Sequence, residues 1–217
     1  MNSEITISET FLSRKPERSS SLAGLASIVA IFVSSVIYWD NKWDLAQWLP
    51  ASGETVFHKH QYWRLLSGIL VHSDFTHFFS NAIPLAFFSS LLYGYFGFTI
   101  FPLLMMVLGC LIHLISILTY PPEATLVGAS GVVYCMAGFW LTLYVLIERR
   151  YSIANRLMRS IGFFLIVFVP SAFDPSVSYR AHAIGFTAGI LSAILYFVIN
   201  RKIIREAETF ELEETDA

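Results

Sequence analysis

The sequence predicts an all-α polytopic membrane protein with six transmembrane helices and an interfacial loop between the first two. Hydrophobic residues make up 55% of the 217 residues, and the mean hydropathy is +0.60. Charged residues make up only 14%, against about 25% in typical soluble domains. Long apolar runs recur along the whole chain, which is too many for a single anchor. No cationic stripe indicates a nucleic-acid partner.

The two ends of the chain differ from the apolar middle. Residues 1–21 are polar and rich in serine, and we expect a flexible cytosolic tail there. The first apolar run is not followed by a small-residue cleavage site, so it is interpreted as an uncleaved anchor. Residues 22–200 form the predicted six-helix domain. Residues 201–217 form the predicted cytosolic tail, and its acidic part, from Glu206 to Ala217, is expected to be disordered and solvated.

Six apolar runs have the length of roughly 17–25 residues that a spanning helix needs. The run 157–173 contains Pro170, which makes it the weakest of the six. The predicted spans are 22–38, 76–93, 99–118, 130–147, 157–173 and 182–200.

The long connection between the first two spans, residues 39–75, is rich in aromatic residues with polar residues between them. Tryptophan and tyrosine prefer the headgroup level of a bilayer. We therefore expect this amphipathic loop to lie in the outer interface.

Basic residues predict the orientation, because Lys and Arg are enriched in cytoplasmic segments. With cytosolic termini, ten basic residues lie on the inside and four on the outside. This asymmetry, with a short N-terminus free of organelle signals, favours a bacterial plasma membrane with both termini in the cytoplasm. The inside set is Arg14, Lys15, Arg18, Arg149, Arg150, Arg156, Arg159, Arg201, Lys202 and Arg205, and the outside set is Lys42, Lys59, Arg64 and Arg180.

Polar residues inside spans are costly and are functional candidates by default. Three spans that run from outside to inside carry such residues in their outer halves: His77 and Asn81, then Ser130, then His182. Each residue alone also fits helix packing or interhelical hydrogen bonding. Their similar depth favours a joint site, provided that the three helices are neighbours.

These residue types suit acyl transfer. A serine becomes a nucleophile when a neighbouring base takes its proton, and His182 is the candidate base for Ser130. The Ser130 N–H at a helix start, His77 and the Asn81 amide are candidate donors to an oxyanion. The three spans contain no Asp or Glu, so the catalytic unit is predicted to be a dyad. Asp74 lies at the outer end of a span and is not assigned a role.

Small residues supply the predicted contact between the helices. Gly185 and Gly189 follow His182 at +3 and +7, on one stripe of the last span. Ser130, Tyr134 and Ala137 form a similar stripe on the fourth span. If these stripes meet, Ser130 can hydrogen-bond to His182 and the Tyr134 ring can pack on the imidazole.

Other titratable residues have plainer interpretations. His113 in the third span is read as a packing or hydrogen-bonding residue, and His58 and His60 as solvated loop residues. Cys110 and Cys135 lie in apolar runs and are read as small buried hydrophobes. The chain has no HExxH motif, and neither a metal nor another cofactor is expected.

Together these residues resemble the rhomboid family of intramembrane serine proteases, roughly from Trp63 to Gly189. Five motif blocks occur in family order. They are Trp63-Arg64, then His72, then His77-x-x-x-Asn81, then Gly128-Ala129-Ser130-Gly131 with Tyr134 at +4, and finally Ala181-His182-x-x-Gly185-x-x-x-Gly189.

The resemblance implies a serine endopeptidase that cleaves transmembrane segments of membrane proteins, its partners in the lipid bilayer. It implies that Trp63 and Arg64 shape the interfacial loop, that His72 supports it, and that Tyr134 stacks on His182. Many relatives carry a charged, Glu-containing turn between the second and third spans, whereas residues 93–97 here are short and uncharged. This departure concerns cytosolic-side packing, not the outer-side chemistry.

Three alternatives stay open. A specialised rhomboid subgroup processes sorting signals, and the compact six-span form suits it as well as a general rhomboid. A non-catalytic rhomboid-like protein would bind membrane helices without cleaving them, but Ser130 and His182 are both present. A channel or transporter predicts internal repeats and interrupted helices, and neither is found in the sequence.

Overall fold

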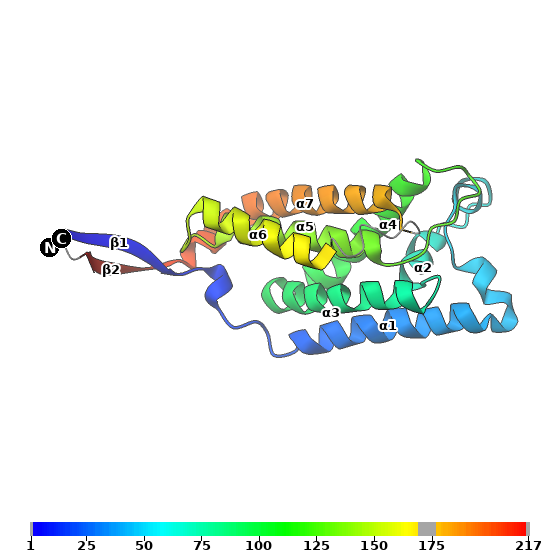
Figure 1. Ribbon diagram of the computed structural model, residues 1–217, viewed down its shortest axis with the longest axis horizontal. Coiled ribbons are helices and arrows are strands. Elements are labelled where there is room, and N and C mark those ends of the chain that lie inside the picture. The colour runs from blue at the N-terminus through cyan, green and yellow to red at the C-terminus, as the bar shows by residue number, and fades with distance from the viewer. Residues whose placement is uncertain (1, 169–176, 216–217) are drawn as a thin grey trace.

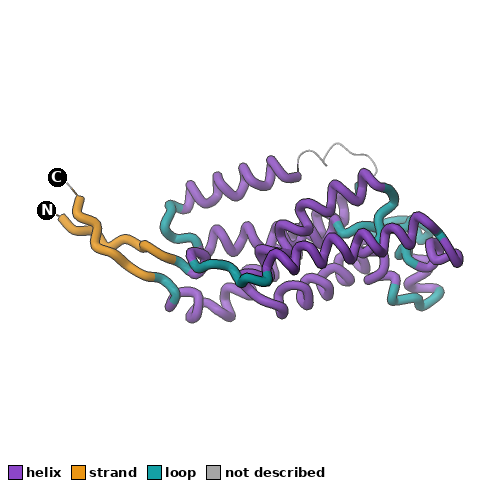
Figure 2. The backbone as a smooth tube through the Cα atoms, turned by 90° about the horizontal axis from the view of Figure 1, so that it is seen from below, coloured by secondary structure: helices purple, strands orange, loops and turns teal. Residues whose placement is uncertain are grey.

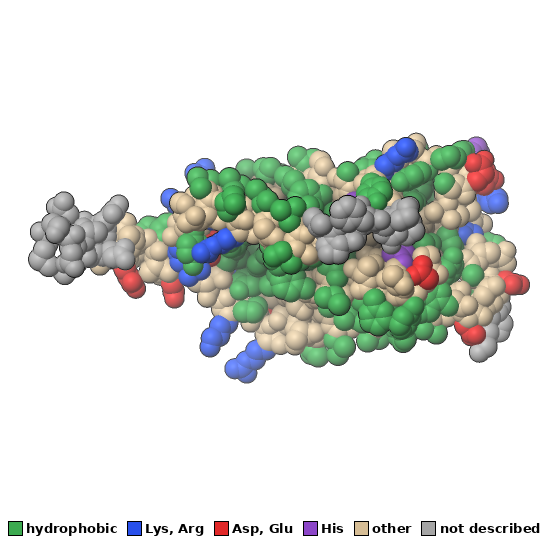
Figure 3. Space-filling view, in the orientation of Figure 1, with side chains coloured by type: hydrophobic (Ala, Val, Ile, Leu, Met, Phe, Trp, Pro, Cys, Tyr) green, Lys and Arg blue, Asp and Glu red, His purple; other side chains and the backbone are tan. Residues whose placement is uncertain are grey.

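The computed structural model describes residues 2–168 and 177–215 and forms a bundle of α-helices (Figure 1). This confirms the predicted all-α polytopic fold class. Apolar side chains cover much of the length of the bundle, and charged side chains gather towards its two ends (Figure 3). The helices are α1 (Ser20–Asp40), α2 (Arg64–Leu70), α3 (Phe75–Phe98), α4 (Met105–Ile117), α5 (Ser130–Ile147), α6 (Ile153–Phe168) and α7 (Tyr179–Glu206).

The connection between α1 and α3 is folded rather than extended. It contains the 3-10 helix η2 (Lys42–Trp48), the π-helical turn η3 (Glu54–His58) and α2. Backbone bonds join it to the loop that precedes α5, because Ala51 and Leu126 exchange two N–H···O contacts of 3.1 and 2.7 Å. The interfacial segment is thereby attached to the loop that leads to Ser130.

The chain reverses direction between α3 and α4. Gly97 has φ 72° and Phe101 is extended, and these residues interrupt the helical run at η4 (Thr99–Leu104). A positive φ favours glycine, which has no Cβ to clash. Figure 1 shows α4 returning towards α2. The uncharged turn at residues 93–97 is thus accommodated by one glycine.

Helix α5 is the centre of the bundle, as its burial shows. Eleven of its residues are buried, which is most of its length, and α7 runs beside it (Figure 1). Phe139, Leu143 and Ile147 are fully buried on α5. Its side chains therefore meet protein on nearly every face, unlike those of a lipid-facing helix.

Helix α6 is different. It is amphipathic, and only Ser160 and Phe168 are buried, while Ile166 is 79% exposed. Residues 169–173 of the predicted fifth span, with Pro170, lie outside the described residues. Among the described residues, four helical segments are long and apolar enough to span a membrane, one of which joins α3 to α4. The span count of six therefore stays a prediction.

The expectation of two flexible tails is wrong for the described residues. Strand β1 (Asn2–Glu9) pairs antiparallel with β2 (Thr209–Thr215), and the ribbon projects from the end of the bundle that holds both termini (Figures 1 and 2). Polar composition hid an alternation typical of strands: Ile5 faces Leu212 and Ile7 faces Phe210.

Ion pairs hold the base of this ribbon. Glu208 accepts from Arg205 at 2.6 Å and from Arg149 at 3.1 Å, and the Glu208 side chain is 4% exposed. Glu148 binds Arg150 at 2.6 Å. These contacts bring the α5–α6 loop and the C-terminal segment together, which predictions from local composition do not reveal.

Candidate active site

The closest helix crossing in the bundle lies between α5 and α7. A Cβ built on Gly185 would overlap the Gly131 carbonyl oxygen, and one built on Gly189 would overlap that of Cys135. One turn further, a Cβ on Gly138 would overlap the Phe186 carbonyl. Gly185 and Gly189 of the stripe predicted on α7 therefore lie against the backbone of Gly131 and Cys135, each one residue after Ser130 and Tyr134 of the stripe predicted on α5. The glycines permit this approach because they have no side chain.

His182 is held against α5 by an aromatic stack. Its ring lies 4.0 Å from that of Tyr134, at an interplanar angle of 11°. Ser178 caps α7 by accepting the Ala181 N–H at 3.2 Å. The His182 side chain is buried, and its Nε2 has no hydrogen-bond partner within the described part of the chain. A buried imidazole nitrogen without a partner is costly unless it is used.

Ser130 is the first residue of α5, so its backbone N–H lies at a helix start and needs no partner within the helix. Gly128 precedes it at φ 107°, where only glycine is unstrained. A Cβ at Gly128 would lie 2.6 Å from Cε1 of His77. The chain before Ser130 thus approaches the His77 ring as closely as glycine permits.

His72 holds the same backbone segment, which leads into α5, in place. Its Nε2 accepts the Ala129 N–H at 3.3 Å, and its Nδ1 lies 3.1 Å from Ser35 Oγ. Since Nε2 accepts, Nδ1 carries the proton and donates it to Ser35. Burial, with a smaller contribution from the nearby His77, lowers the pKa of His72 to about 3. His72 is therefore neutral and connects α1 to the residue before Ser130.

A chain of hydrogen bonds runs from His77 to Asp74. Ser73 Oγ lies 3.1 Å from His77 Nδ1 and donates to Asp74 Oδ2 at 2.8 Å. Asp74 also caps α3 by accepting the His77 N–H at 2.9 Å. This backbone bond, with the one from Ser73, holds the pKa of Asp74 below its usual range. Asp74 is thus a carboxylate two bonds away from the His77 ring.

Asn81 is buried one turn below His77. Its Nδ2 donates to the His77 carbonyl at 2.9 Å and lies 3.4 Å from Ser80 Oγ. The amide therefore stays beside the His77 turn, on a wall that also faces Ser130.

Two cavities meet at Ser130. One, of about 300 Å³, is mainly polar and is also lined by His77, Gly128 and Ser178. The other, of about 270 Å³, lies between α3, α5 and α6 and is also lined by Asn81, Tyr134 and His182. Ser130 and His182 thus share one cavity, and Ser130 also faces a second cavity with a more polar lining.

Trp63 and Arg64 lie away from both cavities, at the start of α2. Arg64 is 4% exposed and donates to the carbonyls of Gln47 and Pro50 at 2.7 and 2.9 Å. It therefore holds the interfacial loop, whereas Trp63 is 53% exposed.

Ser73 and Ser35, near the site, were not singled out from the sequence, and His113 was interpreted there only as a packing or hydrogen-bonding residue. His113 lines the polar cavity, and its buried Nδ1 has no hydrogen-bond partner within the described residues. Ser73 and Ser35 orient His77 and His72. Sequence spacing does not predict such contacts, because the relative position of the contacting segments is determined only by the tertiary fold. No group of three or more potential metal ligands occurs among the described residues.

The fold and these cavities define a polytopic helical membrane protein with a polar site near one end of its bundle. The Rhomboid domain model matches residues 59–199, so the chain belongs to the rhomboid family. It is 29% identical to "RHOMBOID-like protein 1" of Arabidopsis thaliana over 66% of this chain and 36% of that protein. It is 27% identical to the "Putative rhomboid protease YdcA" of Bacillus subtilis (strain 168) over 62% of this chain and 67% of that protein.

Proposed function

We propose that this chain is an intramembrane serine endopeptidase that hydrolyses a peptide bond in or near a transmembrane segment of a membrane protein. Ser130 is the nucleophile and His182 is the general base. The observation that carries the proposal is the stacked, buried His182, whose Nε2 has no hydrogen-bond partner in the described chain, Ser130 included, and which shares a cavity with Ser130.

The first half of the reaction forms an acyl-enzyme. Ser130 Oγ attacks the carbonyl carbon of the peptide bond while His182 Nε2 takes the hydroxyl proton. The tetrahedral intermediate collapses, the C–N bond breaks, and His182 returns the proton to the leaving amine. Tyr134 keeps the imidazole in place through both transfers, because its ring covers one face.

The developing oxyanion receives hydrogen bonds from the Ser130 N–H, His77 Nε2 and one Asn81 Nδ2 N–H, which exchanges its long 3.4 Å contact with Ser80 Oγ for the oxyanion. His77 can donate from Nε2 while its Nδ1 donates to Ser73 only as an imidazolium. The Asp74 carboxylate supports that charge, because Ser73 relays a hydrogen bond between them. Asp74 thus acts on the oxyanion donor, not on His182, and the catalytic unit remains a dyad.

Water completes the reaction. It enters through the polar cavity and attacks the acyl carbon as His182 takes its proton. The ester C–O bond to Ser130 then breaks, His182 returns the proton to Ser130 Oγ, and the carboxylic acid is released. The cavity between α3 and α6 receives the substrate from the bilayer. A substrate helix must partly unwind to present its carbonyl, because its amides are already hydrogen-bonded. Small or helix-breaking residues are therefore expected near the cut.

The proposal includes a location in the bacterial plasma membrane with both termini in the cytoplasm. The basic residues near the ribbon end of the bundle support this orientation. Ser130 then lies below the outer surface, and its polar cavity opens to the outside.

A fluorophosphonate probe tests the nucleophile without knowledge of the natural substrate. The wild type is expected to be labelled and to cleave a model transmembrane substrate, whereas Ser130→Ala and His182→Ala lose both activities. Ser192→Ala is the matched control, because Ser192 lies on α7 and bonds to the Ala188 carbonyl. Cleavage that persists in Ser130→Ala would overturn the proposal.

A further inference from the structure

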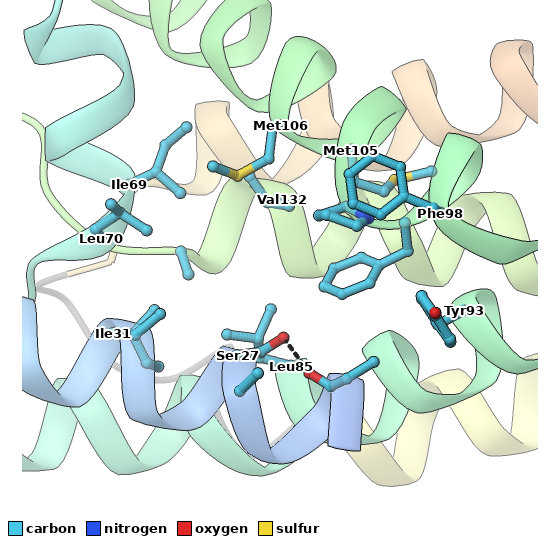
Figure 4. A pocket seen from close by; sticks show the side chains of 16 residues that line it. Ser27, Ile31, Ile69, Leu70, Leu85, Tyr93, Phe98, Met105, Met106 and Val132 are labelled. Carbon is cyan, nitrogen blue, oxygen red and sulfur yellow. Dashed lines mark hydrogen bonds between the residues drawn. The ribbon is translucent and has the colours of Figure 1, made fainter. Parts of the chain in front are cut away.

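A third cavity is lined by no described residue of α6, and none of the proposed chemistry uses it. It has a volume of about 330 Å³ and is lined almost entirely by apolar atoms of α1, α2, α3, α4 and α5. In Figure 4, Met105 and Met106 line the wall opposite Ile31 of α1, and Tyr93 lies at one end. We call it the α1–α4 cavity.

The contents of this cavity follow from its lining. Water needs two or more polar partners, and the lining offers few beyond Ser27 Oγ, which already donates to the Ala23 carbonyl at 2.7 Å. An empty cavity would forfeit dispersion contacts along every wall. Ala26 and Ala30 are exposed, so the cavity reaches the flank of the bundle, where lipid chains surround a spanning helix.

The length of the cavity matches one leaflet. Its lining on α1 runs from Ala23 to Ile31, which is about 12 Å of helix at 1.5 Å per residue. Half of a bilayer core is about 15 Å. The end near Tyr93 lies on the side of the bundle that holds the termini, and the other end reaches Ala129, the residue before Ser130.

Positive charge borders the end near Tyr93. The Glu17 N–H donates to the Gly94 carbonyl at 3.0 Å, and a Cβ on Gly94 would meet Pro16, so the segment before α1 is fastened beside Tyr93. Lys15 and Arg18 in that segment are exposed, and neither forms a salt bridge within the described part of the chain. Glu17, the acid between them, bonds to Ser19.

We propose that the α1–α4 cavity binds one acyl chain of an anionic phospholipid, whose phosphate lies against Lys15 and Arg18. The apolar lining selects the chain and the two cations select the headgroup charge. This site is distinct from the proposed substrate cavity, and it gives the bilayer a contact with Ala129 at the start of the nucleophile helix.

Thermal stability and native mass spectrometry of the purified full chain in detergent test this proposal. Palmitoyl-oleoyl phosphatidylglycerol is expected to raise the Tm and to remain bound as one molecule per chain. The phosphatidylcholine with the same chains should bind more weakly. Glycerol phosphate, which has the charge but no chain, should not raise the Tm; a rise would assign the site to a free phosphate.

Two pairs of variants distinguish the binding contribution of the lipid acyl chain from that of the lipid headgroup. Ala26→Phe with Ala30→Phe fills the cavity and should abolish retention, whereas Val29→Phe with Val33→Phe enlarges exposed positions of α1 outside the lining and should not. Lys15→Gln with Arg18→Gln should weaken phosphatidylglycerol binding about 30-fold, if each cation contributes about 1 kcal/mol. Arg201→Gln with Lys202→Gln, in exposed residues of α7, is the control.

Retention of phosphatidylglycerol by the filled variant would overturn the cavity assignment, and equal binding of the two phospholipids would overturn the role of the cations. If the double filling prevents folding, Ala30→Leu against Val33→Leu gives the same comparison with a smaller change. These readouts measure lipid binding alone, so an inactive enzyme that still binds the lipid would count against the proposed protease and not against this site.

Discussion

The two helices that flank α5 near the site, α7 and α6, are packed in opposite ways. Backbone atoms of α5 and α7 approach so closely that Gly185 and Gly189 admit no side chain. By contrast, a Cβ added to Gly162 of α6 would meet nothing within 4 Å, and most of α6 faces outward. The proposed catalytic groups lie at the close crossing of α5 and α7, and the cavity proposed for the substrate lies on the side of α6, which is packed less closely.

This difference separates two demands on an intramembrane protease. The nucleophile and base must keep their geometry to within a fraction of an ångström, which a glycine-lined crossing provides. A substrate helix must enter laterally from the lipid, which requires a helix at the edge of the bundle that can move aside. Helix α6 suits that role because it buries only Ser160 and Phe168 among its described residues. The following predictions test this division, beginning with the largest expected effect.

Adding one methyl group to α7 or to α6 should have different effects on activity. Gly189→Ala should lower kcat/KM for a model substrate about 100-fold, or about 2.7 kcal/mol, because the Cβ pushes α7 away from the Cys135 carbonyl. Gly162→Ala adds the same methyl to open space and should raise stability by about 0.5–1 kcal/mol through helix propensity. Cleavage assays and thermal unfolding measure both, and equal activity losses in the two variants would contradict the division.

The charge of Asp74 is expected to matter next. Asp74→Asn keeps a helix-capping side chain but removes the carboxylate that supports a cationic His77. We expect kcat to fall about tenfold, or about 1.4 kcal/mol, with KM little changed. Asp44→Asn, at an exposed position of η2, is the control. Unchanged kcat in Asp74→Asn would limit this residue to capping.

The stack on His182 should have a smaller effect. Aromatic pairs contribute about 0.5–1.5 kcal/mol beyond burial, so Tyr134→Leu is expected to lower kcat/KM up to about tenfold. Tyr134→Phe retains the ring that lies 4.0 Å from the imidazole and should retain more activity than the leucine variant. Identical kinetics for the two variants would show that ring stacking does not position the base.

Much of this arrangement could be predicted from the sequence, and the remainder depends on long-range contacts. Hydropathy places the helices because each must satisfy its backbone within itself in lipid. Helical periodicity then places Gly185 and Gly189 on the stripe of His182. The geometry agrees with these stripes, whereas the chemical roles of the residues remain proposals.

The rest could not be read locally. The β1–β2 ribbon joins residues that are far apart in sequence: Ser8, for example, bonds to Thr209, 201 positions later. Each half of the ribbon on its own therefore has the composition of a polar tail. Ser35, the partner of His72, lies on α1, and Ser73, the partner of His77, lies just before α3; hydropathy does not determine which side chains these residues meet. His113 has no spacing pattern with Ser130, and only the folded loop brings both to one cavity.

The last prediction concerns stability in acid rather than activity, and it tests whether neutral His72 holds the backbone before Ser130. The pKa of His72 is lowered to about 3 in the folded protein, against about 6.5 unfolded. Between these values the unfolded chain binds the extra proton, so this contribution to stability is complete above pH 6.5 and is lost as the pH falls towards 3. Each pH unit is worth at most about 1.4 kcal/mol.

His72→Gln can still accept the Ala129 N–H but does not titrate, so its unfolding free energy should fall less steeply between pH 6.5 and 4.5 than that of the wild type. The window ends at 4.5 because Asp74, whose pKa is also lowered, acts in the same direction in stronger acid. His58→Gln, at an exposed loop position, should keep the wild-type slope. Equal slopes in wild type and His72→Gln would mean that protonation of His72 does not release the backbone before Ser130.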